Sequence, residues 1–328
     1  MPVVASPFSS ASISVVIPAY CSESVDEVVD SVSELPPETV VVVDSSPQEP
    51  PQLVDGVRRL WSSDRLNPAA ARNRGAEMIS SDYILFLDSD VVLTDGAREF
   101  VQQFLVGPDQ EVVAGVYKTD RSRNNSVDDF QNAVLRYRLL GRRGEQTRHG
   151  STSHLLVRRD VFEQVGGFNP ELETDEDIEF SARCFKFGYR VHVDQRFEAT
   201  HLKRFSALSL LWDNARKTYD AFLARRRYPA VYRGFGMNLG LTLWTTLVAG
   251  CLLPLAVLGV VIRPDAGVVD AVVVAGLALS PVMLWPRVLR ERPGKVKGLG
   301  LVLWPAIAWV VATAIFLAGI WWLCHRTK

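Results

Sequence analysis

Three short apolar runs constrain the fold of this chain of 328 residues most strongly. They read ISVVIPAY at 13–20, TVVVVD at 39–44 and DYILFLDSD at 82–90, and none shows the polar alternation of a half-exposed strand. Stretches typical of helices lie between them, at 22–35 and 67–79. Continuous apolar strands that alternate with helices predict an α/β domain with a parallel sheet covered by helices on both faces.

Polar residues stand where each of these predicted strands ends. The first strand ends at Ala19-Tyr20, the second at Asp44-Ser45, and the third at Asp88-Ser89-Asp90. A carboxylate buried without a partner is costly, whereas ligands of open α/β sheets bind outside the carboxyl ends of the strands. We therefore expect these side chains to converge on a ligand at the mouth of the sheet.

The chemistry of that ligand is narrowed by what the strand ends contain. A phosphate-binding glycine fingerprint of the dinucleotide or P-loop type is absent from the sequence. Hard carboxylate oxygens suit Mg²⁺ or Mn²⁺ that bridges the phosphates of a substrate.

The formal net charge of −1 gives no indication of a nucleic-acid partner. The four cysteines have no paired or metal-ligand spacing, and the N-terminus does not resemble a signal peptide, which favours a reducing compartment.

The C-terminal part of the chain has a different composition. Residues 236–262 and 298–324 contain no charged side chain, and each run is long enough to span a hydrocarbon core of about 30 Å. The shorter apolar stretch 266–286 lies between them and contains Asp270. The sequence predicts three transmembrane spans over 234–328, with two spans and a re-entrant segment as the alternative.

The basic loops predict the orientation of these spans. Arginines cluster before the first span, within 225–233, and arginines and lysines lie between the second and third, within 287–297. The positive-inside rule places both clusters in the cytoplasm, so we expect a multi-pass protein of the cell membrane with a cytoplasmic N-terminal domain. The basic tail HRTK would then lie outside, which is weak contrary evidence.

An amphipathic helix and a linker are predicted at 205–233, between the N-terminal domain and the first span. One face gathers large side chains at helical spacing, namely Phe205, Leu208, Trp212, Ala215, Tyr219 and Phe222. Such a helix either packs on its own domain or lies in the membrane interface as an amphipathic helix. The sequence leaves both alternatives open.

A series of motifs resembles one family of enzymes. VVIPAY, VVVD, NPAAARNRG, LFLDSD, GGF and EDIEFSARCFKFGYR occur in this order between residues 13 and 205. Together they resemble the inverting glycosyltransferase family 2, whose members have the GT-A fold. The resemblance implies that residues 1–204 form a catalytic domain that binds a nucleotide-sugar donor and Mg²⁺ or Mn²⁺.

The resemblance also implies roles for individual residues at the donor site. Asp44 would contact the nucleotide base, and Arg72 would lie near the nucleotide. Asp90 and His201 would be ligands of the metal, and Asp88, between the ribose and the metal, would be a further ligand. The full set implied for donor binding is Pro18, Tyr20, Glu23, Asp44, Arg72, Asp88 and Ser89.

Asp177 corresponds to the general base of the family. The interval from FGYR back to Glu176-Asp177 favours it over Asp175. At the start of a helix, the dipole and backbone N–H groups are expected to keep Asp177 ionised. Glu176 and Arg183 would support the site or the acceptor, and Arg183 would form an ion pair that orients the acidic cluster.

Two departures from the family pattern affect the substrates. The second strand continues as VVVDSSPQEP where the family has Asp-Asp-Gly-Ser, so the second acidic residue, which bears on base and ribose contacts in the family, is missing here. A Gln-x-x-Arg-Trp stretch, typical of processive synthases, is absent, so transfer of one sugar per encounter is expected. The arginine-rich segment 121–160 would contact a phosphate of the acceptor or form a solvated surface.

The leading hypothesis is a membrane-anchored glycosyltransferase whose acceptor is a polyprenyl phosphate or a glycolipid. A nucleotidyltransferase is one alternative, but it would show a glycine-rich, basic stretch after the first strand, where this chain has PAYCSESVDE. A non-catalytic component of a transport system is another. Asp270 alone is ionisable within the predicted spans, too little for a polar substrate path.

Overall fold

The computed structural model describes residues 11–233, except 36, 52, 108–109, 119–125 and 141–148. The predicted transmembrane spans lie outside the described residues. The chain divides into two compact units. The first comprises Met1–Lys118, Gln146–Lys203 and Tyr228–Met237, and the second Thr119–Glu145, Arg204–Arg227 and Asn238–Lys328.

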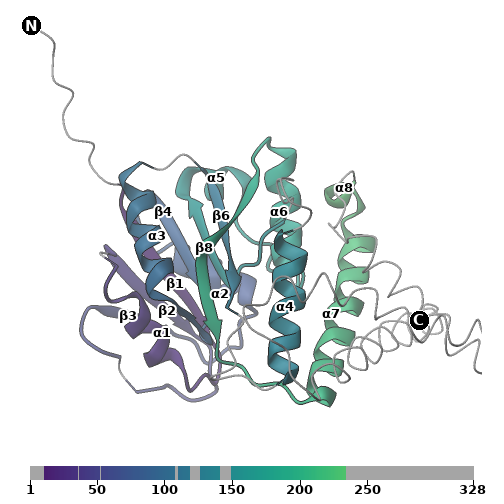
Figure 1. The fold of residues 1–328 in the computed structure, drawn as a ribbon, viewed down its shortest axis with the longest axis horizontal. Coiled ribbons are helices and arrows are strands. Elements are labelled where there is room, and N and C mark those ends of the chain that lie inside the picture. Colours follow the sequence, from purple (N-terminus) through teal and green to yellow (C-terminus); the bar gives the residue numbers. More distant parts are fainter. Residues whose placement is uncertain are drawn as a thin grey trace, which may run out of the picture. The chain divides into compact units, whose positions relative to one another are not determined.

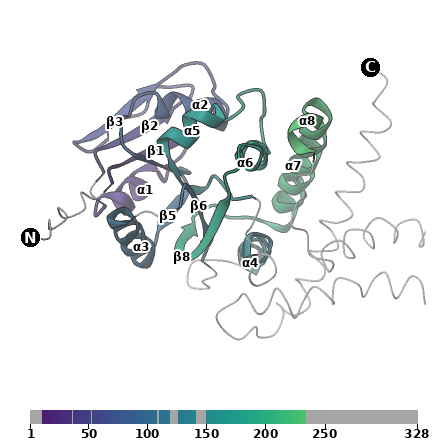
Figure 2. The same ribbon diagram turned by 90° about the horizontal axis from the view of Figure 1, so that it is seen from above.

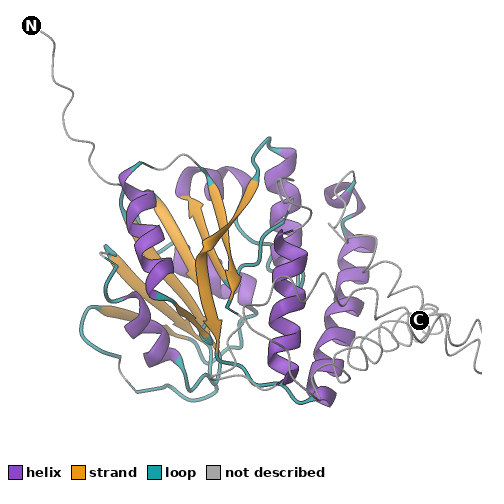
Figure 3. Ribbon diagram, in the orientation of Figure 1, coloured by secondary structure: helices purple, strands orange, loops and turns teal. Residues whose placement is uncertain are grey.

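The first unit is built on a mixed sheet of eight strands within the described residues, in the order β3-β2-β1-β4-β7-β6-β8-β5 (Figures 1 and 3). Its strands are β1 (Ile13–Ala19), β2 (Thr39–Asp44), β3 (Val57–Trp61), β4 (Tyr83–Leu87), β5 (Val91–Leu93), β6 (Val112–Tyr117), β7 (His154–Arg158) and β8 (Val191–His201). The three predicted strands are confirmed as β1, β2 and β4.

The expectation of a parallel sheet is right for one half of the sheet and wrong for the other. β3, β2, β1 and β4 are parallel neighbours. β7 runs antiparallel to both β4 and β6, and β5 runs antiparallel to β8. Because β6 and β8 are parallel to each other, their carboxyl ends lie at the same edge as those of β1, β2 and β4. The starts of β5 and β7 lie at this edge too.

Helices cover both faces of the sheet (Figure 2). α2 (Pro68–Ala76), α5 (Arg159–Val165) and α6 (Glu176–Lys186) contribute to one buried apolar cluster with the strands. The rings of Phe86, Phe162, Phe168 and Phe180 meet in this cluster, with the Phe168 and Phe180 centroids 4.8 Å apart. α1 (Val25–Val32) and α3 (Asp95–Val106) lie on the opposite face from α2 and α5.

Small residues allow α2 to approach the sheet closely. Asn67 caps the helix by accepting a hydrogen bond from the backbone N–H of Ala70, and Pro68 starts it with a suitable φ. A Cβ atom at Gly75 would lie 2.3 Å from Cγ1 of Val16 in β1, so only glycine fits there. This close approach buries the Arg72 side chain against the sheet.

The described part of the second unit contains α4 (Ser126–Leu140) and α7 (Ala207–Arg227). Asp128 is buried, and its Oδ1 accepts a hydrogen bond of 2.7 Å from the backbone N–H of Phe205, just before α7. The helix predicted within 205–233 is confirmed as α7. No helix in the described ranges combines the length and apolarity that crossing a bilayer requires. An interfacial position for α7 stays a prediction.

Candidate active site

The turn after β4 forms the centre of the candidate site. The backbone N–H of Asp88 donates to the carbonyl of Ser153 (2.9 Å), and the N–H of Val91 donates to the carbonyl of Asp88 (3.1 Å). β5 follows at once and pairs with β8, with Val91 opposite His201. This short antiparallel pairing brings Asp90 beside His201, although the two residues are far apart in the sequence.

Asp90 and His201 form a pair that could hold a divalent cation. Oδ2 of Asp90 lies 3.5 Å from Nε2 of His201, and both side chains are only partly buried. Burial raises the pKa of Asp90, but His201 and then Lys203 outweigh it and leave the pKa below its usual value. An ionised carboxylate beside an imidazole fits Mn²⁺ or Mg²⁺ that takes its other ligands from phosphates and water. Within the described residues, no group of three or more His, Cys, Asp or Glu side chains is suited to hold a metal.

Arg72 holds the remaining aspartate of the turn. Its guanidinium is buried and donates to Oδ1 of Asp88 (2.5 Å) and to Oε1 of Glu176 (2.8 Å). Burial raises the pKa of Asp88, with further contributions from the charges of Asp90 and Glu176 that Arg72 opposes. Arg72 thus links the turn after β4 to the start of α6. The structure brings together Asp88, Arg72 and Glu176, all of which the sequence had placed in the site.

Asp177 occupies the second position of α6, directly after Glu176. Its side chain is partly buried, and its Oδ1 accepts a hydrogen bond from the backbone N–H of Ile178 (2.8 Å). Burial, followed by the charges of Glu176 and Asp175, raises the pKa of Asp177 to about 7, against opposition from the Ile178 N–H and Arg72. The expectation that the helix start alone keeps this carboxyl firmly ionised is therefore wrong.

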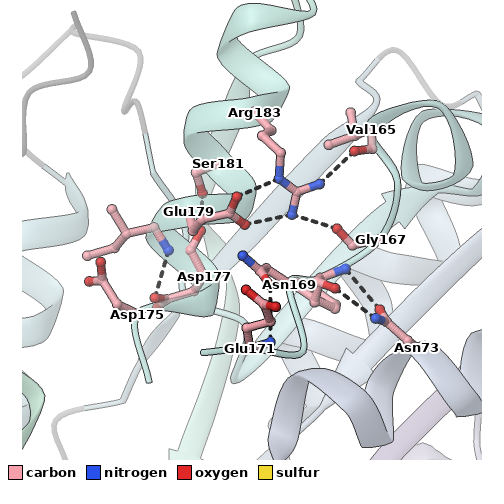
Figure 4. A network of polar contacts seen from close by, with 12 residues as sticks. Asn73, Val165, Gly167, Asn169, Glu171, Asp175, Asp177, Glu179, Ser181 and Arg183 are labelled. Atoms are coloured by element: carbon pink, nitrogen blue, oxygen red, sulfur yellow. Dashed lines mark hydrogen bonds and ion pairs between the residues drawn. The ribbon is translucent and has the colours of Figure 1, made fainter. Parts of the chain in front are cut away.

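The loop between α5 and α6 is fixed from both sides (Figure 4). Arg183 forms the predicted ion pair, with Glu179 (2.7 Å), and also donates to the carbonyls of Val165 (2.6 Å) and Gly167 (2.7 Å). Asn73 of α2 bonds both the N–H (2.9 Å) and the carbonyl (2.7 Å) of Phe168. At the GGF motif (166–168), side chains of α2 and α6 therefore form hydrogen bonds with the loop that leads to Asp177.

The predicted donor-binding residues lie around the carboxyl ends of β1, β2 and β4. Asp44 is buried, and its Oδ1 accepts a hydrogen bond from the N–H of Ser46 (2.9 Å) in the turn after β2. The ring of Tyr20 is exposed and lies 5.1 Å from the Arg65 guanidinium carbon. Pro18 is partly buried in β1, and Glu23 is exposed.

Ser89 joins two segments of this edge. Its carbonyl accepts hydrogen bonds from the hydroxyls of Ser22 (3.0 Å) and Ser24 (2.7 Å), which ties the turn after β4 to the segment after β1. Ser24 is the N-cap residue of α1, but its hydroxyl makes no capping hydrogen bond to the helix. These serines therefore hold the two segments together at the donor side.

Tyr117 is a residue that the sequence analysis missed. It ends β6, its ring is buried, and the ring centroid lies 5.0 Å from that of His201. Burial, then the charges of Asp88 and Asp90, raises the pKa of its hydroxyl well above the usual value. Tyr117 therefore stays a neutral hydroxyl beside the aspartates. Its position as the polar end of an apolar strand, VVAGVY, is the same signal that identified Asp44 and Asp88.

Comparisons with known proteins identify relatives of this chain. A model of the family described as "Glycosyl transferase family 2" matches residues 14–166. Amylovoran biosynthesis glycosyltransferase AmsB from Erwinia amylovora is 36% identical over 264 residues, covering 66% of this chain and 84% of AmsB.

Other relatives match shorter parts of their own length. Succinoglycan biosynthesis protein ExoA from Rhizobium meliloti is 25% identical over 206 residues, covering 56% of this chain and 61% of ExoA. Pre-mycofactocin glycosyltransferase from Mycobacterium tuberculosis is 28% identical over 139 residues, covering 39% of this chain and 28% of that protein. The chain therefore spans less than two thirds of the length of these two relatives.

A solved structure shares the fold. Mannosyltransferase PcManGT from Pyrobaculum calidifontis, in complex with GDP-Man and Mn²⁺, has a TM-score of 0.54 at 15% identity. The likeness covers 99% of this chain and 90% of PcManGT. The expected α/β fold of the GT-A type is thereby confirmed, with the mixed sheet described above.

Proposed function

Because the chain belongs to glycosyltransferase family 2, we propose that it transfers a single sugar from a nucleotide-sugar donor to a membrane-borne acceptor, with inversion of the anomeric centre. One observation carries this proposal. A single edge of the sheet gathers the Asp90–His201 pair, the Arg72–Asp88–Glu176 cluster and Asp177, whose pKa is raised to about 7. These groups supply what the transfer of a sugar from a nucleotide diphosphate requires.

In this proposal, Asp90, His201 and Arg72 form the part of the site that binds the nucleotide-sugar donor. Asp90 and His201 would hold Mg²⁺ or Mn²⁺, which, when bound, stabilises the negative charge of the departing nucleotide diphosphate. Arg72 forms an ion pair with Asp88 at the turn after β4. The Mn²⁺ and GDP-Man in the mannosyltransferase of the same fold are consistent with this proposal.

The acceptor side is served by Asp177. The attacking hydroxyl must lose its proton as the new glycosidic bond forms, and a carboxylate with a pKa near the working pH is well suited to accept it. A single carboxylate base with direct attack is a single displacement, which inverts the anomeric configuration. In this mechanism the chain contributes no covalent nucleophile.

The proposed acceptor is a polyprenyl phosphate or a glycolipid in the cell membrane. Support comes from the uncharged runs 236–262 and 298–324. A basic cluster precedes each of these runs, within 225–233 and 287–297. In this proposal residues 1–233 face the cytoplasm, where nucleotide sugars are made available. The names of AmsB and ExoA connect those relatives with amylovoran and succinoglycan biosynthesis.

The test is nucleotide release from a panel of nucleotide sugars by the full-length protein, with native membranes as the source of acceptor and Mn²⁺ or Mg²⁺ added. Asp177→Asn should lower transfer by about 10² to 10⁴-fold, the usual contribution of a general base. Asp95→Asn is the matched control, because Asp95 also lies in the first turn of a helix but is exposed and pairs with Arg98. A product with retained configuration, or full activity of Asp177→Asn, would contradict the mechanism.

A further inference from the structure

A short segment at 228–233, which contains α8 (Pro229–Tyr232), contacts the elements that carry Asp177. The hydroxyl of Tyr232 donates a hydrogen bond of 2.9 Å to Oδ2 of Asp175, and the hydroxyl of Tyr228 donates to the carboxylate of Glu171. The amine of Lys186, at the end of α6, donates to the carbonyl of Ala230. We call residues 228–233 the brace segment.

The brace segment contacts the loop at a strained residue. Asp175 has φ 68° and ψ 9°, the left-handed conformation that few non-glycine residues adopt. Its carbonyl accepts the first hydrogen bond of α6, from the N–H of Glu179 (3.0 Å). The conformation of Asp175 therefore sets the direction in which α6 starts, and Asp177 lies two positions further along.

Other side chains hold the first part of the loop. Asn73 and Arg183 hold Gly167 and Phe168, and the Asn67 side chain donates to the carbonyl of Pro170 (2.7 Å). These bonds fix the first part of the loop against α2 and α6. The bond from Tyr232 acts at its last residue, directly before α6. A strained conformation persists where the surrounding structure holds it, and the Tyr232 hydroxyl is in place to do so.

We propose that Tyr232 is a positioning residue for transfer: its hydroxyl holds Asp175 in the left-handed conformation that directs the first turn of α6, and with it Asp177, toward the acceptor hydroxyl. This inference rests on the proposed function, in which Asp177 is the general base. In the sequence, the brace segment directly precedes the first predicted span, which begins at residue 236.

The first experiment removes only the hydroxyl of Tyr232. Full-length Tyr232→Phe should show a kcat about three- to thirtyfold lower, since misplacing a reacting group by about 1 Å can cost about 10²-fold. Its KM for the nucleotide sugar should not change, because the donor side does not depend on this contact. Tyr189→Phe, which removes a hydroxyl bonded to Gln164 on the surface, is the matched control and should retain the kcat of the wild type.

A double variant tests whether Tyr232 acts through Asp177. In an Asp177→Asn background, Tyr232→Phe should cause no further loss of kcat, because the base that it positions is already absent. An equal fold-loss in both backgrounds, or an unchanged kcat of Tyr232→Phe, would overturn the inference. Wild-type activity of Asp177→Asn would instead reject the proposed function, so the two failures are distinguishable.

A second pair of variants covers the case in which Tyr232→Phe does not fold. Asn tolerates the left-handed conformation and its side-chain oxygen can still accept the Tyr232 hydrogen bond, whereas Ala does neither. Above about pH 8, where Asp177 is ionised in all of them, Asp175→Asn should retain most of the kcat and Asp175→Ala should lose it. Equal activity of Asp175→Asn and Asp175→Ala would overturn the positioning role.

Discussion

The raised pKa of Asp177 predicts a steep acid limb in the pH profile of transfer. A general base must be ionised, and the pKa of Asp177 is raised to about 7 by burial and then by Glu176 and Asp175. The ionised fraction is then about one tenth at pH 6 and about one hundredth at pH 5, so kcat should fall tenfold for each pH unit below 7. A carboxyl group with an ordinary pKa would instead give a profile that is flat above about pH 5.

The assay is nucleotide release by the full-length protein at saturating donor, between pH 5 and pH 9. Asp175→Asn removes a negative charge that raises the pKa of Asp177, so its acid limb should move to lower pH. Asp177→Asn should lose the limb altogether, along with most of the activity. The Asp95→Asn control should keep both the limb and the plateau of the wild type.

The raised pKa of Asp177 also predicts that the folded state becomes less stable as the pH rises. The pKa of Asp177 is higher in the folded than in the unfolded chain, so the folded state binds more protons between about pH 4 and pH 7 and becomes less stable as the pH rises through this window. Asp177→Asn carries no such penalty and should melt higher than the wild type at pH 8, with a smaller difference near pH 4. A flat activity profile between pH 5 and pH 8, together with equal melting at pH 8, would refute the reasoning.

Three further predictions concern the metal, Arg72 and the membrane topology. Asp90→Ala and His201→Ala should each lose Mn²⁺-dependent binding of a nucleoside diphosphate in calorimetry, and undiminished transfer in excess chelator would reject the metal proposal. Arg72→Leu should lower the free energy of unfolding by about 3–5 kcal/mol in denaturant melts, because it leaves two carboxylates without their buried partner. The control Arg98→Leu breaks pairs with exposed carboxylates and should lower the free energy of unfolding by less than about 1 kcal/mol. A reporter fused after residue 328 should lie outside the cell, and a cytoplasmic reporter would mean that 266–286 does not cross the membrane.

The sequence analysis predicts β1, β2 and β4 and does not predict β3, β6 or β7. β1, β2 and β4 are continuous apolar runs that end in polar residues, a pattern readable without a structure. β3 has the sequence VRRLW and is only partly buried, so its two arginines hide it from a search for apolar runs. The direction of β7 could not be predicted either, because HLLVR is equally apolar whether it pairs parallel or antiparallel. Whether a strand pairs parallel or antiparallel depends on the path of the chain that connects it to the preceding strand.

The sequence identifies candidate site residues that follow the ends of strands, whereas the contacts that join these residues depend on the tertiary structure. Asp88, Asp90 and Asp177 stand at ends of elements, and the family motifs identified them. The distance between Asp90 and His201 depends on the pairing of β5 with β8, which is three residues long and leaves no periodic signal. The contact of Tyr232 with Asp175 joins segments that no motif connects. Such contacts require the folded chain.

The ionisation of Asp177 shows how two correct principles can oppose each other. A position in the first turn of a helix favours a carboxylate by about 0.3–1 kcal/mol at the surface, which corresponds to less than one pKa unit. Complete burial can shift the pKa of a carboxyl group by up to about 3–5 units in the other direction, partial burial acts in the same direction, and neighbouring carboxylates add to it. Glu176 and Asp175 are adjacent in sequence, so their contribution could have been anticipated, but the burial of Asp177 could not. Burial is the larger effect, and it converts a side chain that would be ionised at every physiological pH into a base poised near neutrality.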